Sequence, residues 1–309
     1  MSIERFYAQL LFICSALFVG LGACEISAAP FNYRSRPKPK TFLEWCIQKP
    51  KLDPETRRTI EALLRVAETS DCQEANQYLK SREGLGLSGS GITNLEPLSS
   101  LTHVTELSLH ETQVSDLKPL SSMTNLTTLS ITGAKKLTDI SPLSSLVKLN
   151  RLDIVNSPIT DITTLAEMHE MQDLLLYGNQ ISNLAPLSSM TKLIRLTVND
   201  NKVSNLTPLS SLTDLRILNL SCNQIQDISP LASLIKLNRL ALSSNRIRDI
   251  QPLVTLKSLG RLSLSDNRIR DIQPLRSLPY IQVENVDIKG NPISGSYSKT
   301  ERNCSYFPL

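Results

Sequence analysis

The chain has 309 residues, of which 40% are hydrophobic and 20% are charged, a balance typical of soluble globular proteins. Its formal net charge of +4 is small and the basic residues form no recognised motif, which argues against a nucleic-acid-binding protein that relies on a strongly basic face. Aromatic residues make up only 5% of the chain, so leucine and isoleucine must fill its interior.

The first 23 residues (1–23) have the features of a targeting segment for export. Residues 6–23 carry a single strongly polar side chain, Gln9, and they run into the sequence LGAC, which resembles the lipobox of bacterial lipoproteins. A lipoprotein signal would make Cys24 the acylated first residue of the mature chain and tether it to a membrane. Two alternatives stay open: cleavage by an ordinary signal peptidase near Ala28, or an uncleaved anchor, since the apolar run approaches bilayer-spanning length.

A linker and a small helical domain are predicted to follow. Residues 24–40 include the stretch PFNYRSRPKPK, whose prolines and four basic side chains without an acid favour an extended, solvated linker. Residues 41–83 are predicted to form a helical N-terminal cap. Pro54 leads into apolar residues at helical spacing between residues 60 and 66, and Asp71 is a suitable N-cap for a second short helix.

Four cysteines follow Cys24, and two of them fall in the predicted cap. In an oxidising compartment Cys46 and Cys72 are the natural disulfide pair, because a bond between them would staple a small element that lacks a large core. The alternative is that both are reduced and buried. Cys222 and Cys304 are left unpaired, since several stacked repeats are expected to separate them.

Residues 84–293 consist of one unit repeated ten times. Equivalent leucines or isoleucines recur every 22 residues, with one extra residue after Ile131 and two after Leu264. Each unit reads L-x-x-L-x-L-x-x-N-x-I-x-D-I-x-P-L-x-x-L, which matches the leucine-rich-repeat consensus. In the L-x-L segment the leucines point inward and the residues between them line a parallel sheet. Because a single strand cannot bury its own apolar edge, the ten coils are predicted to stack into a solenoid.

Two other positions of the unit shape the turns between strands. An asparagine just after the strand is predicted to bond the unpaired backbone groups of the turn. Earlier units carry the smaller Ser90, Thr112 and Ser157 there, so we expect the N-terminal half of this ladder to be weaker. A recurring proline prevents a long helix on the outer side, which is predicted to contain short helical turns. The asparagines are Asn179, Asn201, Asn223, Asn245, Asn267 and Asn291.

The repeats are similar to those of the bacterial internalins, in which a helical cap precedes units that contain D-I-S-P-L and S-S-L. Asp139–Leu143 and Asp227–Leu231 both read DISPL, and the resemblance covers residue 41 to about residue 293. It implies an α/β right-handed solenoid of ten repeats, with a concave parallel β-sheet, a convex side of short helical turns and a helical N-terminal cap. Residues 294–309 are interpreted as a C-terminal cap or tail. The resemblance does not name a partner, because relatives of this architecture bind unrelated molecules.

No catalytic group, metal site or cofactor is predicted. Gly84–Gly89 fits the dinucleotide fingerprint G-x-G-x-x-G, but this segment is itself the first repeat strand rather than a loop that opens a helix. His103, Glu106 and His110 are close in sequence, yet only the last two face the sheet side, so they are interpreted as ordinary surface residues. The sequence has no H-E-x-x-H motif, no C-x-x-C motif and no phosphate-binding loop.

The outward positions of the strands form three columns, and a partner-binding patch is predicted on the central repeats. Apolar side chains are expected at exposed sites there, ringed by arginines, which is the usual chemistry of binding hot spots. The alternative is that these are the scattered apolar groups of any protein surface. Arg151 and Arg195 flank Asp173, which favours ion pairs over acid catalysis. The predicted patch comprises Arg151, Asp153, Val155, Asp173, Leu175, Tyr177, Arg195, Ile217 and Arg239.

These features together predict a non-enzymatic binding module, secreted or anchored at the cell envelope, that acts as a monomer. A protein or glycan partner is expected on the concave face, and a membrane is expected as a second partner if Cys24 is acylated. Two other functions stay open: a structural scaffold of the envelope held by Cys24, and an intracellular regulatory subunit that binds an enzyme.

Overall fold

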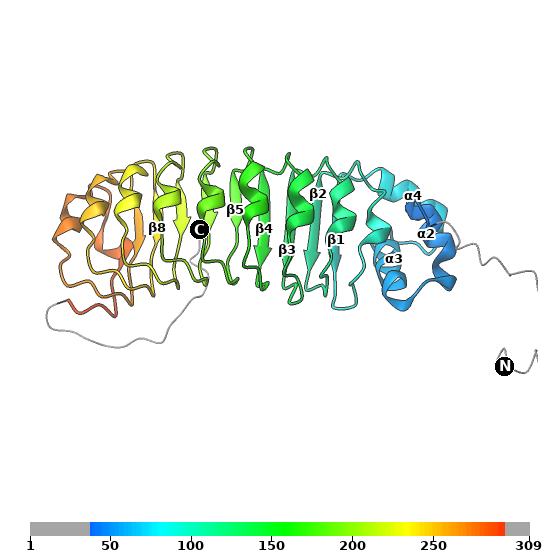
Figure 1. The fold of residues 1–309 in the computed structure, drawn as a ribbon, viewed down its shortest axis with the longest axis horizontal. Coiled ribbons are helices and arrows are strands. Elements are labelled where there is room, and N and C mark those ends of the chain that lie inside the picture. The colour runs from blue at the N-terminus through cyan, green and yellow to red at the C-terminus, as the bar shows by residue number, and fades with distance from the viewer. Residues whose placement is uncertain (1–37, 294–309) are drawn as a thin grey trace, which may run out of the picture. The chain divides into compact units, whose positions relative to one another are not determined.

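The computed structural model describes residues 38–293, which hold a helical segment followed by a stack of repeats (Figure 1). The expected signal segment with Cys24, nearly all of the expected linker, and the tail with Cys304 lie outside the described residues. Within residues 38–293, no helix combines the length and the apolar character that crossing a membrane requires.

Within residues 38–83, three short α-helices and one 3-10 helix precede the repeats, and each α-helix begins at a side chain that caps it. Thr41, Asp53 and Asp71 accept hydrogen bonds from backbone amides of the first turns, as N-cap residues do. The two helices predicted from the sequence are confirmed, whereas the first helix has only seven residues, too few for its apolar spacing to be recognised. The elements are α2 (Phe42–Gln48), η1 (Lys49–Lys51), α3 (Pro54–Val66) and α4 (Cys72–Lys80).

A disulfide bond joins α2 to the start of α4. It links Cys46 to Cys72, the pair expected from the sequence, with their Cα atoms 5.7 Å apart. Cys222, which the sequence leaves unpaired, is also disulfide-bonded in the structure. The small cap therefore has a covalent crosslink in addition to the apolar contacts of Phe42 and Trp45, both of which are buried.

One sheet of ten parallel strands runs along the whole stack, in sequence order from β1 to β10 (Figure 1). This order confirms the ten predicted strands, and the register pairs equivalent residues of neighbouring repeats, for example Leu107 with Leu129 and Leu129 with Leu152. The strands are β1 (Gly84–Ser88), β2 (Glu106–His110), β3 (Thr128–Thr132), β4 (Arg151–Val155), β5 (Asp173–Leu175), β6 (Arg195–Thr197), β7 (Ile217–Asn219), β8 (Arg239–Ala241), β9 (Arg261–Ser263) and β10 (Val286–Asp287).

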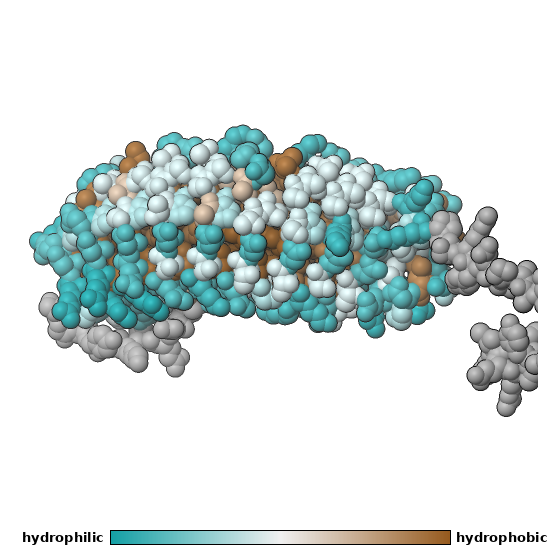
Figure 2. Space-filling view, in the orientation of Figure 1, coloured by the Kyte–Doolittle hydropathy of each residue, from teal (hydrophilic) through white to brown (hydrophobic). Residues whose placement is uncertain are grey.

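Short 3-10 helices form the outer side of the stack, as the recurring proline predicts. Proline occupies the first or second position of most of these helices, where its missing N–H group costs no hydrogen bond. Figure 2 shows the stack covered mostly by hydrophilic and neutral side chains in this view. The repeat helices are η2 (Glu96–Leu98), η3 (Lys118–Ser122), η4 (Ser141–Ser145), η5 (Thr163–Glu167), η6 (Ala185–Leu187), η7 (Thr207–Leu209), η8 (Ser229–Ser233), η9 (Gln251–Thr255) and η10 (Gln273–Ser277), followed by η11 (Val283–Asn285) before β10.

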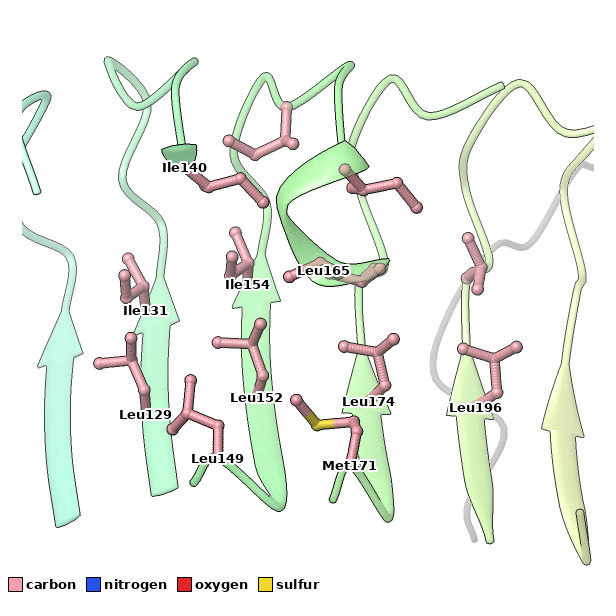
Figure 3. Packing of buried hydrophobic residues seen from close by; sticks show 14 of the residues in the cluster. Leu129, Ile131, Ile140, Leu149, Leu152, Ile154, Leu165, Met171, Leu174 and Leu196 are labelled. Atoms are coloured by element: carbon pink, nitrogen blue, oxygen red, sulfur yellow. The ribbon is translucent and has the colours of Figure 1, made fainter. Parts of the chain in front are cut away.

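The core is a continuous column of aliphatic side chains between the sheet and the outer turns. Equivalent leucines and isoleucines of successive coils stack on one another, and nearly all of them are completely buried. Figure 3 shows Leu152, Ile154 and Leu174 pointing inward from the strands to meet Leu165 from an outer turn. Burying such a side chain contributes about 1.5–3 kcal/mol, and every coil covers an apolar edge of the next one.

Six asparagines, five of them buried and Asn201 half-buried, form a ladder along the turn that follows the strands, and we refer to them as the asparagine ladder. Asn223 is typical: its Nδ2 donates to the carbonyls of Val198, Leu220 and Ser221 at 2.9–3.2 Å, and its Oδ1 accepts from the Val203 amide at 2.9 Å. Each amide therefore bonds its own coil and the preceding one. The ladder comprises Asn179, Asn201, Asn223, Asn245, Asn267 and Asn291.

The ladder is weaker in the N-terminal repeats, as predicted. Ser157 makes one long hydrogen bond there, from its hydroxyl to the Val155 carbonyl at 3.4 Å. The Thr112 hydroxyl is buried and has no hydrogen-bond partner among the described residues. A short hydroxyl side chain cannot reach the four backbone groups that an asparagine amide bonds, so these turns keep fewer crosslinks between coils.

Gly178 has a left-handed backbone conformation, which strains any residue that has a Cβ atom. Its φ angle is +69°, and an added Cβ would lie 2.2 Å from Oδ1 of Asn156. We expect Gly178→Ala to lower the free energy of unfolding by about 1–2 kcal/mol, the cost of a left-handed conformation for a residue with a Cβ. Urea denaturation would measure this difference. Gly260→Ala is the matched control, because its nearest neighbour would lie at 3.5 Å, and an equal loss in both variants would contradict the argument.

Candidate functional site

The outward side chains of β1–β10, which we call the sheet face, lie in the columns that the repeat pattern predicts. In the first column, Arg151 pairs in register with Asp173 and Asp173 with Arg195, and the column continues through Ile217 to Arg239. Paired strands lie about 4.8 Å apart, so side chains of one column are in reach of their neighbours. The sheet face is thus a rigid surface whose chemistry follows directly from the residues between the leucines.

The middle column of the sheet face is largely covered in the later repeats. Thr197, Asn219 and Ala241 are buried, although they point away from the core. The third column is buried there as well, at Asn199, Ser221 and Ser243. The surface that a partner could touch in these repeats is therefore formed mainly by the first column.

Val155 was expected to be an exposed apolar anchor of the patch, and this prediction is wrong. The side chain is only 4% exposed. Val155 pairs in register with Thr132 on one side and lies next to the coil of Tyr177 on the other, since the Asn156 amide donates to the Tyr177 carbonyl. A short β-branched side chain between two neighbours at strand spacing is enclosed by them.

Three other apolar residues of the predicted patch do reach solvent. Leu175, Tyr177 and Ile217 are each half-buried on the sheet face. Leu175 belongs to the middle column of β5, Tyr177 follows the same strand, and Ile217 opens β7. The apolar centre of the patch is thus smaller than predicted, but its members lie within three neighbouring repeats.

Two ion pairs fix the acidic side chains of the patch. Nη2 of Arg151 lies 3.0 Å from Oδ2 of Asp153, and Nε of Arg195 lies 3.2 Å from Oδ1 of Asp173. Of the two arginines expected to flank Asp173, Arg195 forms an ion pair with it and Arg151 forms one with Asp153. The buried Oδ1 of Asp153 has no hydrogen-bond partner within residues 38–293. Asp153 and Asp173 therefore each bind an arginine side chain of the sheet face.

Arg239 differs from these two arginines. It is half-buried and forms no ion pair with any residue in the described part of the chain. Its register neighbours are Ile217 and Arg261, so no carboxylate stands beside it in the column. Arg239 consequently gives this part of the sheet face a positive charge that an acidic group of a partner can neutralise.

A surface hollow of about 660 Å³ lies beside Ile217, and we call it the basic hollow. The sequence reasoning missed its members from the loops before the strands, because only strand positions were aligned into columns. Lys236 is paired with Asp214 there, and the hydrogen bond from Lys236 lowers the pKa of the Asp214 carboxyl. The residues that line the basic hollow are Arg195, Arg216, Ile217, Lys236, Asn238, Arg239 and Ser258.

Each histidine has a local contact of its own. Nε2 of His103 lies 2.9 Å from the Leu79 carbonyl, and Nδ1 of His110 is hydrogen-bonded to the Thr132 hydroxyl. Among residues 38–293, no three His, Cys, Asp or Glu side chains are close enough together to hold a metal ion. Gly84–Ser88 forms strand β1, in agreement with the interpretation that the glycine motif is a repeat strand.

Comparisons with known proteins agree with this architecture. A family model for leucine-rich repeats in two copies matches residues 102–145, 191–233, 213–255 and 235–277. No curated protein matches the chain. Among solved structures, the plant peptide hormone receptor RGFR1 in complex with RGF2 is 19% identical, with a TM-score of 0.55, over 69% of this chain and 41% of the receptor chain. At this identity the similarity shows the fold alone.

Two internalins from Listeria monocytogenes are more similar in sequence. The internalin inlF is 34% identical, with a TM-score of 0.65, over 76% of this chain and 75% of the internalin. The internalin C2 (inlC2) is 30% identical, with a TM-score of 0.54, over 74% of this chain and 91% of the internalin. From these matches and the ten stacked repeats, the chain belongs to the bacterial internalin-like leucine-rich-repeat proteins.

Proposed function

We propose that the chain is a non-enzymatic binding module that holds a protein partner on the sheet face, across β4–β8. The observation that carries this proposal is the position of Leu175, Tyr177 and Ile217. These half-buried apolar side chains lie on a rigid sheet, and Ile217 also lines the basic hollow. Aromatic and apolar anchors with arginines at their edge are the usual centre of a protein interface.

The charges around Ile217 define the chemistry of the partner. Ile217 stands between Arg195 and Arg239 in one column, and Arg239 has no carboxylate of its own within the described residues. A partner segment that places an apolar side chain on Ile217 and a carboxylate beside Arg239 would match both features. We therefore propose an acidic protein segment as the preferred ligand, with a glycan as the less favoured class.

One solved structure of the same fold supports this use of the repeats. RGFR1 was solved as a complex with RGF2, which shows that a leucine-rich-repeat receptor of this fold holds a ligand. The support is an analogy between folds, because the two chains share 19% identity. The placement of the ligand on this chain rests on Leu175, Tyr177 and Ile217.

A peptide library displayed on phage and selected against the immobilised chain would test the proposal. A selected peptide gives a defined ligand whose Kd can be measured by calorimetry. We expect Leu175→Ser with Tyr177→Ser to raise this Kd at least tenfold, which corresponds to about 1.4 kcal/mol of binding free energy. The thermal unfolding midpoint should stay close to that of the wild type, because both side chains are only half-buried.

Val147→Ser with Ile235→Ser is the matched control, since these two side chains are 50% and 57% exposed and lie in loops before the strands rather than on the sheet face. The control should bind the selected peptide with the affinity of the wild type. If the peptide binds both double variants with unchanged affinity, the partner surface lies elsewhere. If both variants lose affinity equally, binding follows exposed apolar area and not the sheet face.

We also propose that the protein is exported and anchored at the cell envelope through Cys24, or secreted. The disulfide between Cys46 and Cys72 supports export, because such bonds persist in oxidising compartments. The intact mass of the mature protein, isolated from its natural host, would distinguish these routes. An acylated chain that begins at Cys24 would support the anchor, whereas a full-length chain with reduced Cys46 and Cys72 would contradict export.

A further inference from the structure

Four arginines of the last repeats stand apart from the sheet face and have no role in the proposed function. The sequence Asn-Arg-Ile-Arg-Asp occurs twice, 22 residues apart, just after β8 and β9. In both copies the asparagine belongs to the buried ladder and the isoleucine is 0% exposed. Since alternate residues point inward, the remaining positions must point outward. The arginine cluster consists of Arg246, Arg248, Arg268 and Arg270, all of them exposed.

The backbone holds the two arginine pairs close together. The Arg268 amide donates to the Ile247 carbonyl at 2.8 Å, so the two coils are hydrogen-bonded where the arginines project. The Ile247 amide in turn donates to Oδ1 of Asn267 at 3.0 Å. Coils bonded in this way lie about 4.8 Å apart, so the arginine positions of one coil face those of the next. Figure 2 shows strongly hydrophilic side chains gathered along this edge of the last repeats.

The cluster carries positive charge that nearby side chains do not neutralise. No arginine of the cluster forms an ion pair with any residue from 38 to 293. The adjacent Asp249 accepts a hydrogen bond from the Gln251 amide at 2.8 Å, and Asp271 accepts one from the Gln273 amide at 2.8 Å. Both aspartates thereby cap the outer turns. Like charges at equivalent positions of neighbouring coils repel one another and lower the stability of the fold. A bound anion would relieve this repulsion.

The preceding repeat shows that the fold itself does not need arginine at these positions. Gln224 and Gln226 occupy the two sites in the repeat before the cluster, and Gln180 and Ser182 occupy them two repeats earlier. Asn223 makes the same ladder bonds as Asn245, with glutamine on either side of the inward isoleucine. The turn therefore keeps its hydrogen bonds whether or not arginine occupies these two positions.

Three members of the cluster line one surface hollow. Arg248, Arg268 and Arg270 surround it together with Pro292, and its volume is about 330 Å³. A guanidinium group presents a planar fork of donors that matches phosphate oxygens. A phosphate monoester carries a charge of about −1.5 to −2 and three acceptor oxygens, which suits three arginines better than the single charge of a carboxylate.

We propose that Arg248, Arg268 and Arg270 form a binding site for a phosphate monoester, with Arg246 at its edge. The group would come from a soluble phosphorylated molecule or from the headgroup of a phospholipid. The site is separate from the sheet face, because its arginines project from the turns after β8 and β9 and not from the strands. Binding of phosphate and binding of a protein partner are therefore independent properties of the chain.

Calorimetric titration of the protein with inorganic phosphate and with glycerol 1-phosphate, at constant ionic strength, would test the site. Flotation with vesicles that contain phosphatidic acid would test the lipid source. We expect saturable binding in at least one of these arms and a loss of affinity of at least tenfold in Arg248→Gln with Arg270→Gln. These substitutions reproduce the glutamine of the preceding repeat, so the fold should be retained, and the thermal midpoint would verify this.

Lys148→Gln with Lys202→Gln removes the same amount of charge from exposed positions in other coils and should leave the affinity unchanged. Three outcomes would overturn the proposal: no saturable binding in any arm, equal losses in the two double variants, or acetate binding as tightly as phosphate. The first would show that the cluster is not a phosphate site, the second that it attracts anions only through net charge, and the third that it does not select phosphate.

Discussion

Replacing Asn223 by alanine is expected to lower the free energy of unfolding by about 3 kcal/mol. The amide side chain bonds three carbonyls and one backbone amide from two successive coils, and it is 9% exposed. Alanine would leave these groups buried without partners, and each such group costs about 1–3 kcal/mol unless water reaches it. Urea denaturation followed by circular dichroism would measure the loss.

Ser157→Ala at the equivalent position of an earlier repeat is the control. Its single hydrogen bond at 3.4 Å predicts a loss below about 1 kcal/mol. Similar losses in both variants would show that the ladder bonds do not determine the stability of the turns. Hydrogen exchange would add a local test, because the Val203 amide should lose protection only in Asn223→Ala.

Removing the disulfide of the cap, by Cys46→Ser with Cys72→Ser, is expected to destabilise the cap by about 3 kcal/mol. The two cysteines are 26 residues apart, and closing a loop of this length restricts the unfolded chain by about that amount. Because α3 packs against β1, a loosened cap would also uncover the apolar edge of the first repeat. Hydrogen exchange of α2 and α4 amides would report the change.

The comparison should use the double variant without reductant, since Cys222 is also disulfide-bonded and a reductant would act on both bonds. Amides of the later repeats, such as Leu242, serve as the internal control and should keep the protection that they have in the wild type. Unchanged exchange in α2 and α4 would contradict the prediction and show that apolar contacts alone hold the cap.

The fold could be predicted from the sequence because its determinants are local and repeated. The spacing of leucines fixes strand direction, register and core at once, and the structure pairs Leu107, Leu129 and Leu152 as that spacing requires. Helix α2 escaped prediction because seven residues offer too few apolar positions to show a period. The sequence therefore specifies the periodic part of the molecule better than its single, unrepeated elements.

The candidate site was less predictable because exposure depends on neighbours that lie a whole repeat away. Val155 was assigned correctly to the sheet face, yet the adjoining coils enclose it. Arg216, Lys236 and Asn238 were not considered because they precede the strands, and only the folded loops bring them beside Ile217. The direction of a side chain could be inferred from the sequence, whereas its accessibility required the structure.

The geometry of the asparagine ladder has a consequence for how this chain can change in length. Asn201, Asn223 and Asn245 each bond groups 20 and 25 residues upstream, so every amide finds equivalent partners when one complete coil is gained or lost. A deletion of a few residues inside a coil would instead shift each of these partners out of reach. Duplication or excision of entire coils is thus the route by which such a chain can grow or shrink while its interior stays fully bonded.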